Sequence, residues 1–247
     1  MFDFSKQDVM GVVGGLGPMA SAEFLKTIYE CCQGAQEQDF PVVMVHSDPT
    51  CPDRTSAFLA GRPEDVLEPL MLAFNRLLGM GATKLVMCCM TSHHLLPRIP
   101  PTVLERVISL PDIIFEQLAE SGGRHLLICS TGTRQFQIFE NHSRWEIFKR
   151  CFILPDEMDQ QRIHQDLIYP IKLNPDAREV FPILEELMSK YQTDSFIAGC
   201  SEIHLVAKQL VFSGRNQNNY SCIDPLMILA RQIAKERYDA RERAFAI

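Results

Sequence analysis

The protein has 247 residues, of which 46% are hydrophobic and 22% are charged, and its formal net charge is −7. A chain of this size and composition can bury a sizeable core in one large domain or two small ones. The acidic balance and the absence of a basic block argue against a nucleic-acid partner. No apolar run reaches the ~18 residues that a membrane span requires, so we expect no membrane partner.

The cysteine content points to a reducing compartment. There are nine cysteines, an odd number, and no CxxC pair. The N-terminal stretch lacks a basic region followed by a long apolar core, which predicts no signal peptide and a cytoplasmic location. We therefore expect free thiols rather than disulfides. No His/Cys cluster has the spacing of a zinc site, so we expect no metal.

Short apolar runs alternate along the chain with longer segments of helical periodicity. In chain order, the pattern predicts strand 8–15, helix 20–32, strand 40–48, helix 64–81, strand 83–89, helix 110–123, strand 124–130, helix 131–141, strand 150–155, helices 158–173 and 176–192, strand 194–200, a helix within 200–210 and a last helix at 226–245.

This alternation predicts an α/β fold with mainly parallel sheets and helices on both faces. The pattern occurs twice, so we expect two similar three-layer lobes, related by a pseudo-twofold axis, with the active site in the cleft between them. The predicted division is residues 1–116 plus 224–247 for one lobe and 117–223 for the other. Ligands of such sheets bind beyond the carboxyl ends of the strands.

Two of those strand ends carry the same feature. Cys89 and Cys200 each end an apolar strand and are followed by small polar residues and a predicted helix. A pseudo-twofold axis would make the two thiols face each other across the cleft. One thiol could then remove an α-proton while the other delivers a proton to the opposite face, which inverts a stereocentre. A thiol pKa near ~8.5 suits this chemistry, and a helix N-terminus behind each sulfur would favour the thiolate.

Five motifs in order make the chain resemble a known family. They are MGVVGGLGPMAS (10–21), PTCPDRT (49–55), CMTSH (89–93), STGT (130–133) and GCSEI (199–203). They are similar to the motifs of the aspartate/glutamate racemases, and the similarity is strongest to the aspartate racemase branch. The resemblance extends over nearly the whole chain. It implies an isomerase that uses two cysteines, needs no pyridoxal phosphate or other cofactor, acts on a small acidic amino acid and forms a homodimer.

The same resemblance assigns roles to charged residues and thiols. Cys89 and Cys200 match the two acid–base cysteines of the family. Arg54 matches the arginine that binds the substrate's side-chain carboxylate, and Lys172 matches a lysine with a similar role. Glu202 would either orient the start of the following helix or contact the substrate ammonium group.

Hydroxyl residues would complete the predicted site. Thr91 and Ser92, with backbone amides, would hold the α-carboxylate, and Thr131 and Thr133 would line the other lobe. Met90 departs from the family, which has asparagine there, so a polar contact near the substrate would be lost. Strand alternation sends Cys88 to the face opposite Cys89, so we expect Cys88 in the core.

Other activities fit parts of the sequence. Relatives include hydantoin racemases and maleate isomerases, and a non-catalytic amino-acid-binding protein would also carry these motifs. GLGPMA (15–20), with Asp48 at the end of the next strand, matches a dinucleotide-binding turn. Pro18 inside that turn and the paired thiols argue against an oxidoreductase.

Overall fold

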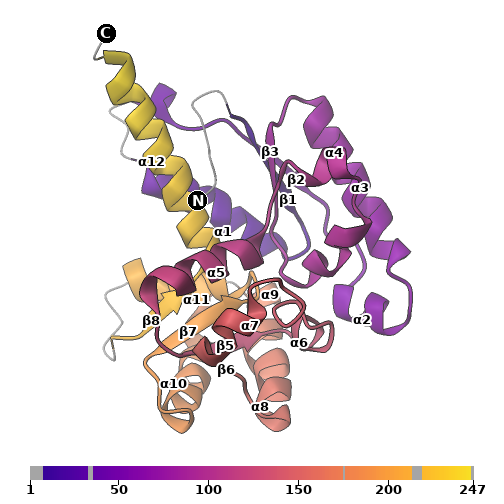
Figure 1. The fold of residues 1–247 in the computed structure, drawn as a ribbon, viewed down its shortest axis with the longest axis vertical. Coiled ribbons are helices and arrows are strands. Elements are labelled where there is room, and N and C mark those ends of the chain that lie inside the picture. Colours follow the sequence, from indigo (N-terminus) through magenta and orange to yellow (C-terminus); the bar gives the residue numbers. More distant parts are fainter. Residues whose placement is uncertain (1–7, 33–35, 175, 213–218, 246–247) are drawn as a thin grey trace.

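A computed structural model describes residues 8–32, 36–174, 176–212 and 219–245 (Figure 1). The strands are β1 (Met10–Gly14), β2 (Val43–Ser47), β3 (Lys84–Met87), β4 (Val107–Ile108), β5 (His125–Cys129), β6 (Phe152–Ile153), β7 (Ser195–Gly199) and β8 (Ser221–Ile223). The α-helices are α1 (Pro18–Cys31), α2 (Arg54–Leu59), α3 (Glu64–Gly79), α4 (Pro101–Leu104), α5 (Leu110–Ser121), α6 (Thr131–Gln135), α7 (Trp145–Phe148), α8 (Glu157–Arg162), α9 (Tyr169–Leu173), α10 (Phe181–Lys190), α11 (Ile203–Phe212) and α12 (Pro225–Phe245). Short 3₁₀ helices are η1 (Glu37–Asp39), η2 (Thr91–Arg98), η3 (Lys149–Cys151) and η5 (Ala177–Val180), and η4 (Ile163–Ile168) is a π-helix.

The strands form two four-stranded parallel sheets with the same topology. Their orders are β2-β1-β3-β4 and β6-β5-β7-β8, so the second strand of each sheet lies at one edge and the third crosses to the other side of the first. In the first sheet Val12 is paired with both Val45 and Val86, and in the second sheet Ile128 is paired with Ala198. The predicted α/β fold with two parallel-sheet lobes is confirmed.

Burial explains why the strands read as continuous apolar runs. Every residue of β1, β5 and β7 is buried, because helices cover both faces of a parallel sheet. In Figure 1 the first sheet lies beside α3, and the second lies between α11 and the group α8 and α10. Helix α12 runs back from the second sheet to pack against α1 and α5. The lobe boundaries drawn from the sequence stay a prediction.

One apolar core connects the lobes. The same cluster of buried side chains contains Val12 and Val86 from the first sheet and Leu127 and Ile197 from the second, together with residues of α5 and α12. Any relative motion of the lobes must preserve this shared core. No helix of the described residues is long and apolar enough to cross a membrane.

The structure differs from the predicted elements in several short segments. Strands β4 and β8 were not predicted, because two or three residues are too few to show a periodicity. The helix predicted at 131–141 ends as α6 at Gln135. Gln137 adopts a left-handed φ of 52°, and the N–H of Ile138 closes the turn on the carbonyl of Thr133 at 3.1 Å.

The segment predicted as one helix at 158–173 is continuous but irregular. It consists of α8, the π-helix η4 and α9. Pro170 has no N–H to donate to the preceding turn, so the regular ladder cannot pass through this point. A π-turn shifts the register of the side chains that follow it, and such turns are frequent at functional sites. Here the irregular segment carries His164, Tyr169 and Lys172 to the seam between the lobes.

Candidate active site

Cys89 lies in the turn between β3 and η2, at the carboxyl end of the first sheet. Its side chain is 7% exposed. His93 holds this turn: its Nδ1 lies 3.0 Å from the carbonyl oxygen of Cys89, and its Nε2 accepts the N–H of Leu110 at 3.1 Å. Because Nε2 accepts from a main-chain N–H, the ring proton is on Nδ1 and donates to the carbonyl. Burial lowers the pKa of His93 to about 4, so the ring is neutral.

The residues on either side of Cys89 face the core. Cys88 is fully buried, and burial raises its pKa far above the usual range of a thiol. The prediction that Cys88 is a core residue is confirmed. Met90 is 1% exposed and belongs to the apolar cluster that joins the lobes. Its thioether therefore adds to packing between the lobes.

Cys200 occupies the equivalent position after β7. Its Sγ donates a hydrogen bond to Oε2 of Glu202 over 2.8 Å, and the hydroxyl of Ser201 donates to the same oxygen over 3.2 Å. Glu202 is 2% exposed and lies against the turn after β1, where a Cβ on Gly17 would stand 2.2 Å from Oε1. The absence of a side chain at Gly17 is therefore what admits this carboxylate.

The electrostatics of Cys200 differ from what its sequence position suggested. Burial raises the pKa of Cys200 well above its usual range, the charge of Glu202 raises it further, and Lys172 lowers it. Cys89 also raises it, so the two thiols are close enough to interact electrostatically. The buried carboxylate of Glu202 therefore opposes a thiolate at Cys200, and the expected contribution of the helix N-terminus stays a prediction.

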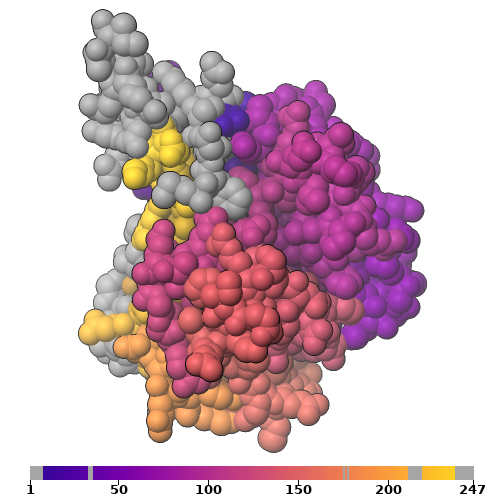
Figure 2. Space-filling model, in the orientation of Figure 1, coloured from indigo at the N-terminus to yellow at the C-terminus, as the bar shows by residue number. Residues whose placement is uncertain are grey.

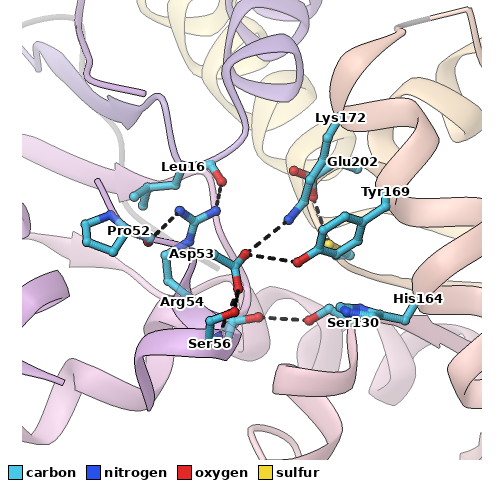
Figure 3. Close-up of polar contacts among 12 residues, drawn as sticks. Leu16, Pro52, Asp53, Arg54, Ser56, Ser130, His164, Tyr169, Lys172 and Glu202 are labelled. Atoms are coloured by element: carbon cyan, nitrogen blue, oxygen red, sulfur yellow. Dashed lines mark hydrogen bonds and ion pairs between the residues drawn. The ribbon is translucent and has the colours of Figure 1, made fainter. Parts of the chain in front are cut away.

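Arg54 is buried beside Cys89, but its hydrogen bonds go to the main chain. One guanidinium nitrogen donates to the carbonyls of Cys51 and Pro52 and the other donates to that of Leu16, while Nε is buried without a hydrogen-bond partner among the described residues (Figure 3). Burial lowers the pKa of Arg54, but nearby negative charge outweighs it, with Cys89 as the largest contributor. Arg54 therefore links the loop after β1 to the loop after β2 by hydrogen bonds, and its positive charge lies next to Cys89.

Lys172 reaches the same region from the second lobe. Its Nζ lies 3.6 Å from Oδ2 of Asp53 and 4.2 Å from the centre of the Tyr169 ring. Burial lowers the pKa of Lys172, but Glu202 and Cys200 lead the negative charges that raise it above its usual value. The ammonium group therefore stays charged next to the second thiol.

A polar contact joins the two lobes close to Arg54 and Lys172. The hydroxyl of Tyr169 donates to Oδ2 of Asp53 over 3.2 Å, and Lys172 approaches the same oxygen (Figure 3). Asp53 also caps α2 by accepting from the N–H and hydroxyl of Ser56. Sequence reasoning missed both residues, although Asp53 lies in the PTCPDRT motif next to Arg54 and Tyr169 precedes Lys172 by three positions.

The four predicted hydroxyl residues lie in three different settings. Thr91 from the first lobe meets Ser130 and Thr133 from the second, with oxygen–oxygen distances of 2.9, 3.1 and 3.1 Å in a closed triangle. Ser92 is fully buried, and its hydroxyl has no partner among the described residues. Thr131 instead lines the pocket described below, and its N–H donates to Nδ1 of His164 over 3.2 Å.

A pocket of about 690 Å³ lies next to the seam, on the side of α2 and α6. Thr55, Leu59, Thr131, His164 and Tyr169 are among its lining residues, and neither Cys89 nor Cys200 is. On the face shown in Figure 2, the violet and magenta atoms of the first lobe lie directly against the red atoms of the second. Both thiols are buried, with Cys89 7% and Cys200 6% exposed.

The turn after β1 does not suit a dinucleotide. The N-terminus of α1, where a pyrophosphate would bind, is met by the buried carboxylate of Glu202 at Gly17. A second anion there would be repelled. Gly15 has φ +81°, and a Cβ there would lie 2.3 Å from the main-chain nitrogen of Asp48, just after β2, so glycine is required at this position on both grounds. The two glycines thus serve a tight strand–helix turn and the approach of Glu202.

The comparison with protein families decides the classification. The profile of the Asp/Glu/hydantoin racemases matches residues 13–233. The chain belongs to this family of isomerases.

Solved racemases share the fold of the family member described here. An aspartate racemase from Picrophilus torridus superimposes with a TM-score of 0.78 at 20% identity, covering 94% of each chain. A glutamate racemase from Campylobacter jejuni gives 0.57 at 14% identity over 93% of this chain and 85% of the other. An allantoin racemase from Klebsiella pneumoniae gives 0.53 at 12% identity over 92% and 86%. At these identities the similarity shows the common fold. Among the described residues no group of three or more His, Cys, Asp or Glu side chains could hold a metal ion.

Proposed function

We propose that this family member is a cofactor-independent amino-acid racemase that interconverts L- and D-aspartate, with glutamate as the second candidate substrate. The observation that carries the proposal is the placement of Cys89 and Cys200. Both thiols follow equivalent central strands of two sheets with one topology, and they interact electrostatically. Two acid–base groups at opposite sides of one cleft are what inversion at Cα requires.

An acidic substrate is supported by the cations at the seam. Lys172 lies next to Cys200, and Arg54 lies next to Cys89. Since both terminal nitrogens of Arg54 already donate to carbonyl groups and only its Nε is without a partner among the described residues, we assign the side-chain carboxylate of the substrate chiefly to Lys172. The name of the similar Picrophilus torridus protein supports aspartate as the first substrate to test.

The α-proton of an amino acid is weakly acidic, so the developing carbanion needs stabilisation. We propose that the unpaired hydroxyl of Ser92, with Thr91 and main-chain N–H groups of the Cys89 turn, holds the α-carboxylate. Hydrogen bonds to this group strengthen as negative charge spreads onto it, and they act most strongly in a site that excludes water. Thr133, in the second lobe, holds the hydroxyl of Thr91 in place through their hydrogen bond.

Substrate entry requires the lobes to open. Both thiols are 6–7% exposed, and the bridge from Asp53 to Tyr169 and Lys172 closes the seam. Partly exposed contacts of this kind contribute about 0.5–1 kcal/mol each, so opening this bridge costs little. The adjoining pocket, which Tyr169 lines, is the proposed route of entry.

The function is tested by incubating L-aspartate with the protein in D₂O and measuring loss of optical activity together with deuterium at Cα. We expect Cys89→Ser and Cys200→Ser each to abolish both signals, while the neighbouring core variant Cys88→Ala retains them. The two-thiol mechanism is wrong if both active-site variants keep most of their activity. The homodimer, the cytoplasmic location and the lobe boundaries stay predictions.

A further inference from the structure

The two thiols occupy equivalent positions but have opposite electrostatic surroundings. The group in hydrogen-bond contact with Cys200 is a carboxylate, whereas the charged group brought to Cys89 is a guanidinium. The two strand ends are equivalent in the fold, but the sulfur atoms that follow them lie next to groups of opposite charge.

The proton between Cys200 and Glu202 lies on sulfur. At 2.8 Å the two groups share one proton, because two anions at this distance would repel each other strongly. A carboxyl group ordinarily loses its proton about four pH units below a thiol, so the carboxylate accepts and the thiol donates. Glu202 also accepts from Ser201, and the N-terminus of α11, which begins at Ile203, favours its negative charge.

The other charged groups around Cys200 do not reverse this assignment. Lys172 faces it from α9 and Cys89 faces it from the end of β3, and Arg54 interacts with Glu202 from α2. Lys172 favours a thiolate at Cys200, but it is shared with Asp53, and Glu202 is in direct contact with the sulfur.

Cys89 has no carboxylate in hydrogen-bond contact among the described residues. The cation next to it, Arg54, donates to the carbonyls of Cys51, Pro52 and Leu16 and also hydrogen-bonds the side chain of Cys51. Asp53, Cys51 and Glu202 share the positive charge of Arg54 with Cys89. Because a two-thiol mechanism needs one base and one acid, holding Cys200 as the acid leaves Cys89 as the base.

We propose that Glu202 is a positioning residue that keeps Cys200 protonated, so that the free enzyme holds Cys89 as the base and Cys200 as the acid. This inference rests on the proposed racemase function. In the forward step the Cys89 thiolate takes the α-proton, and the Cys200 thiol gives its proton to the opposite face of the carbanion. The step leaves Cys89 as a thiol and Cys200 as a thiolate next to Lys172. Reverse turnover restores the starting state, as does exchange with solvent in which Cys89 releases a proton and Cys200 takes one up.

This asymmetry cannot favour one enantiomer. The L and D forms have equal free energies, so kcat/KM must be equal in the two directions whatever the state of the thiols. The asymmetry appears instead in the dependence on pH. In a bell-shaped profile of kcat/KM, the rising limb reports ionisation of the base and the falling limb reports loss of the proton from the acid.

The decisive experiment titrates Cys200 without relying on activity. In the Cys89→Ser background, the rate of alkylation of Cys200 by iodoacetamide is followed against pH by peptide mass spectrometry. We expect Cys200 to ionise above the usual range for a thiol. Adding Glu202→Gln should lower its midpoint by at least about one pH unit, because a like charge in contact is removed.

Matched variants separate charge from structure. Glu202→Asp keeps the carboxylate and should leave the midpoint near that of the parent, and Ser201→Ala removes only the second hydrogen bond and should also leave it in place. With both cysteines present, Glu202→Gln should move the falling limb of kcat/KM to lower pH and leave the rising limb unchanged. If Glu202→Gln fails to fold, Gly17→Ala should displace the carboxylate and lower the midpoint in its place.

The inference is overturned if the Cys200 midpoint stays the same after Glu202→Gln or Gly17→Ala, or if Ser201→Ala shifts it equally. A higher KM with an unchanged midpoint would assign Glu202 to substrate binding instead, which also overturns it. Failure of the racemase proposal gives a different result, namely no deuterium at Cα in the parent protein.

Discussion

The hydroxyl of Tyr169 donates a hydrogen bond to Oδ2 of Asp53 across the seam between the two lobes, over 3.2 Å and a sequence separation of 116 residues. This contact, with Lys172 beside it, joins the lobes near the candidate site, as does the triangle of Thr91, Ser130 and Thr133. Its strength and position lead to a first prediction.

Tyr169→Phe should loosen the closure without removing the ring that packs under Lys172. Losing one partly exposed hydrogen bond costs about 0.5–1 kcal/mol, so the open state should gain about 2- to 5-fold. Alkylation of Cys89 and Cys200 by iodoacetamide should accelerate by that factor. Tyr191→Phe is the control, since its hydroxyl contacts Asp159 away from the seam. Equal effects of both changes would contradict a closure role.

Lys172→Gln should reduce kcat/KM for aspartate by about 10- to 100-fold, because a hydrogen bond to a charged group is lost. Any residual turnover of alanine, which has no side-chain carboxylate, should not change. Steady-state kinetics with both substrates measures the difference. Lys190→Gln removes an exposed lysine paired with Asp156 and should be silent. An equal loss for aspartate and alanine would assign Lys172 to another role.

Arg54→Met should lower the stability of the protein in addition to its activity. Buried carbonyl groups lose their donors, at a cost of about 1–3 kcal/mol. For a chain of this size each kcal/mol corresponds to about 2–4 °C in Tm. Thermal unfolding without substrate should show this decrease, whereas Arg62→Met, an exposed residue paired with Asp65, should not. An unchanged Tm would mean that Arg54 serves substrate binding alone.

His93 should make the protein sensitive to acid. Burial lowers the pKa of His93 from 6.5 to about 4, so folded and unfolded states are both neutral at this position above pH 6.5, where stability is complete. As the pH falls from 6.5 towards 4, only the unfolded state takes up the proton. This should lower the free energy of unfolding by about 3 kcal/mol.

Denaturant unfolding at several pH values measures that loss. His93→Gln, which has no titrating ring, should be less stable at pH 7 but should lose less stability on acidification. His46→Gln, at a partly exposed position on β2, is the control. The same acid sensitivity in His93→Gln and the parent would show that other groups cause it.

Local pattern was enough for the regular elements and for the choice between adjacent thiols. The alternation predicted for a strand over 83–89 separates Cys88 from Cys89, and the structure has Cys88 in the core that joins the lobes, although β3 itself ends at Met87. The sequence pattern did not predict strands as short as β4 and β8. It also did not predict the end of α6, which is set by the left-handed backbone of Gln137.

The candidate site was predictable as a set of positions but not as a set of contacts. The motifs brought forward Arg54, Lys172 and Glu202, all of which lie near a thiol. They could not indicate that the terminal nitrogens of Arg54 donate to carbonyl groups of two loops, or that Asp53 accepts a hydrogen bond from Tyr169. Those contacts join segments far apart in sequence, so no local spacing encodes them.

The sequence by itself determined the α/β alternation, the repeated lobe and the membership that its motifs suggested, because burial and periodicity act over a few residues at a time. Only the tertiary structure decided which charge each sulfur meets. A carboxylate lies next to Cys200 because Gly17, in the other lobe, leaves room for it. A guanidinium lies next to Cys89 because main-chain carbonyl groups of two loops hold it there. The charge next to a buried thiol depends on distances set by packing between lobes, and those distances exist only once the chain has folded.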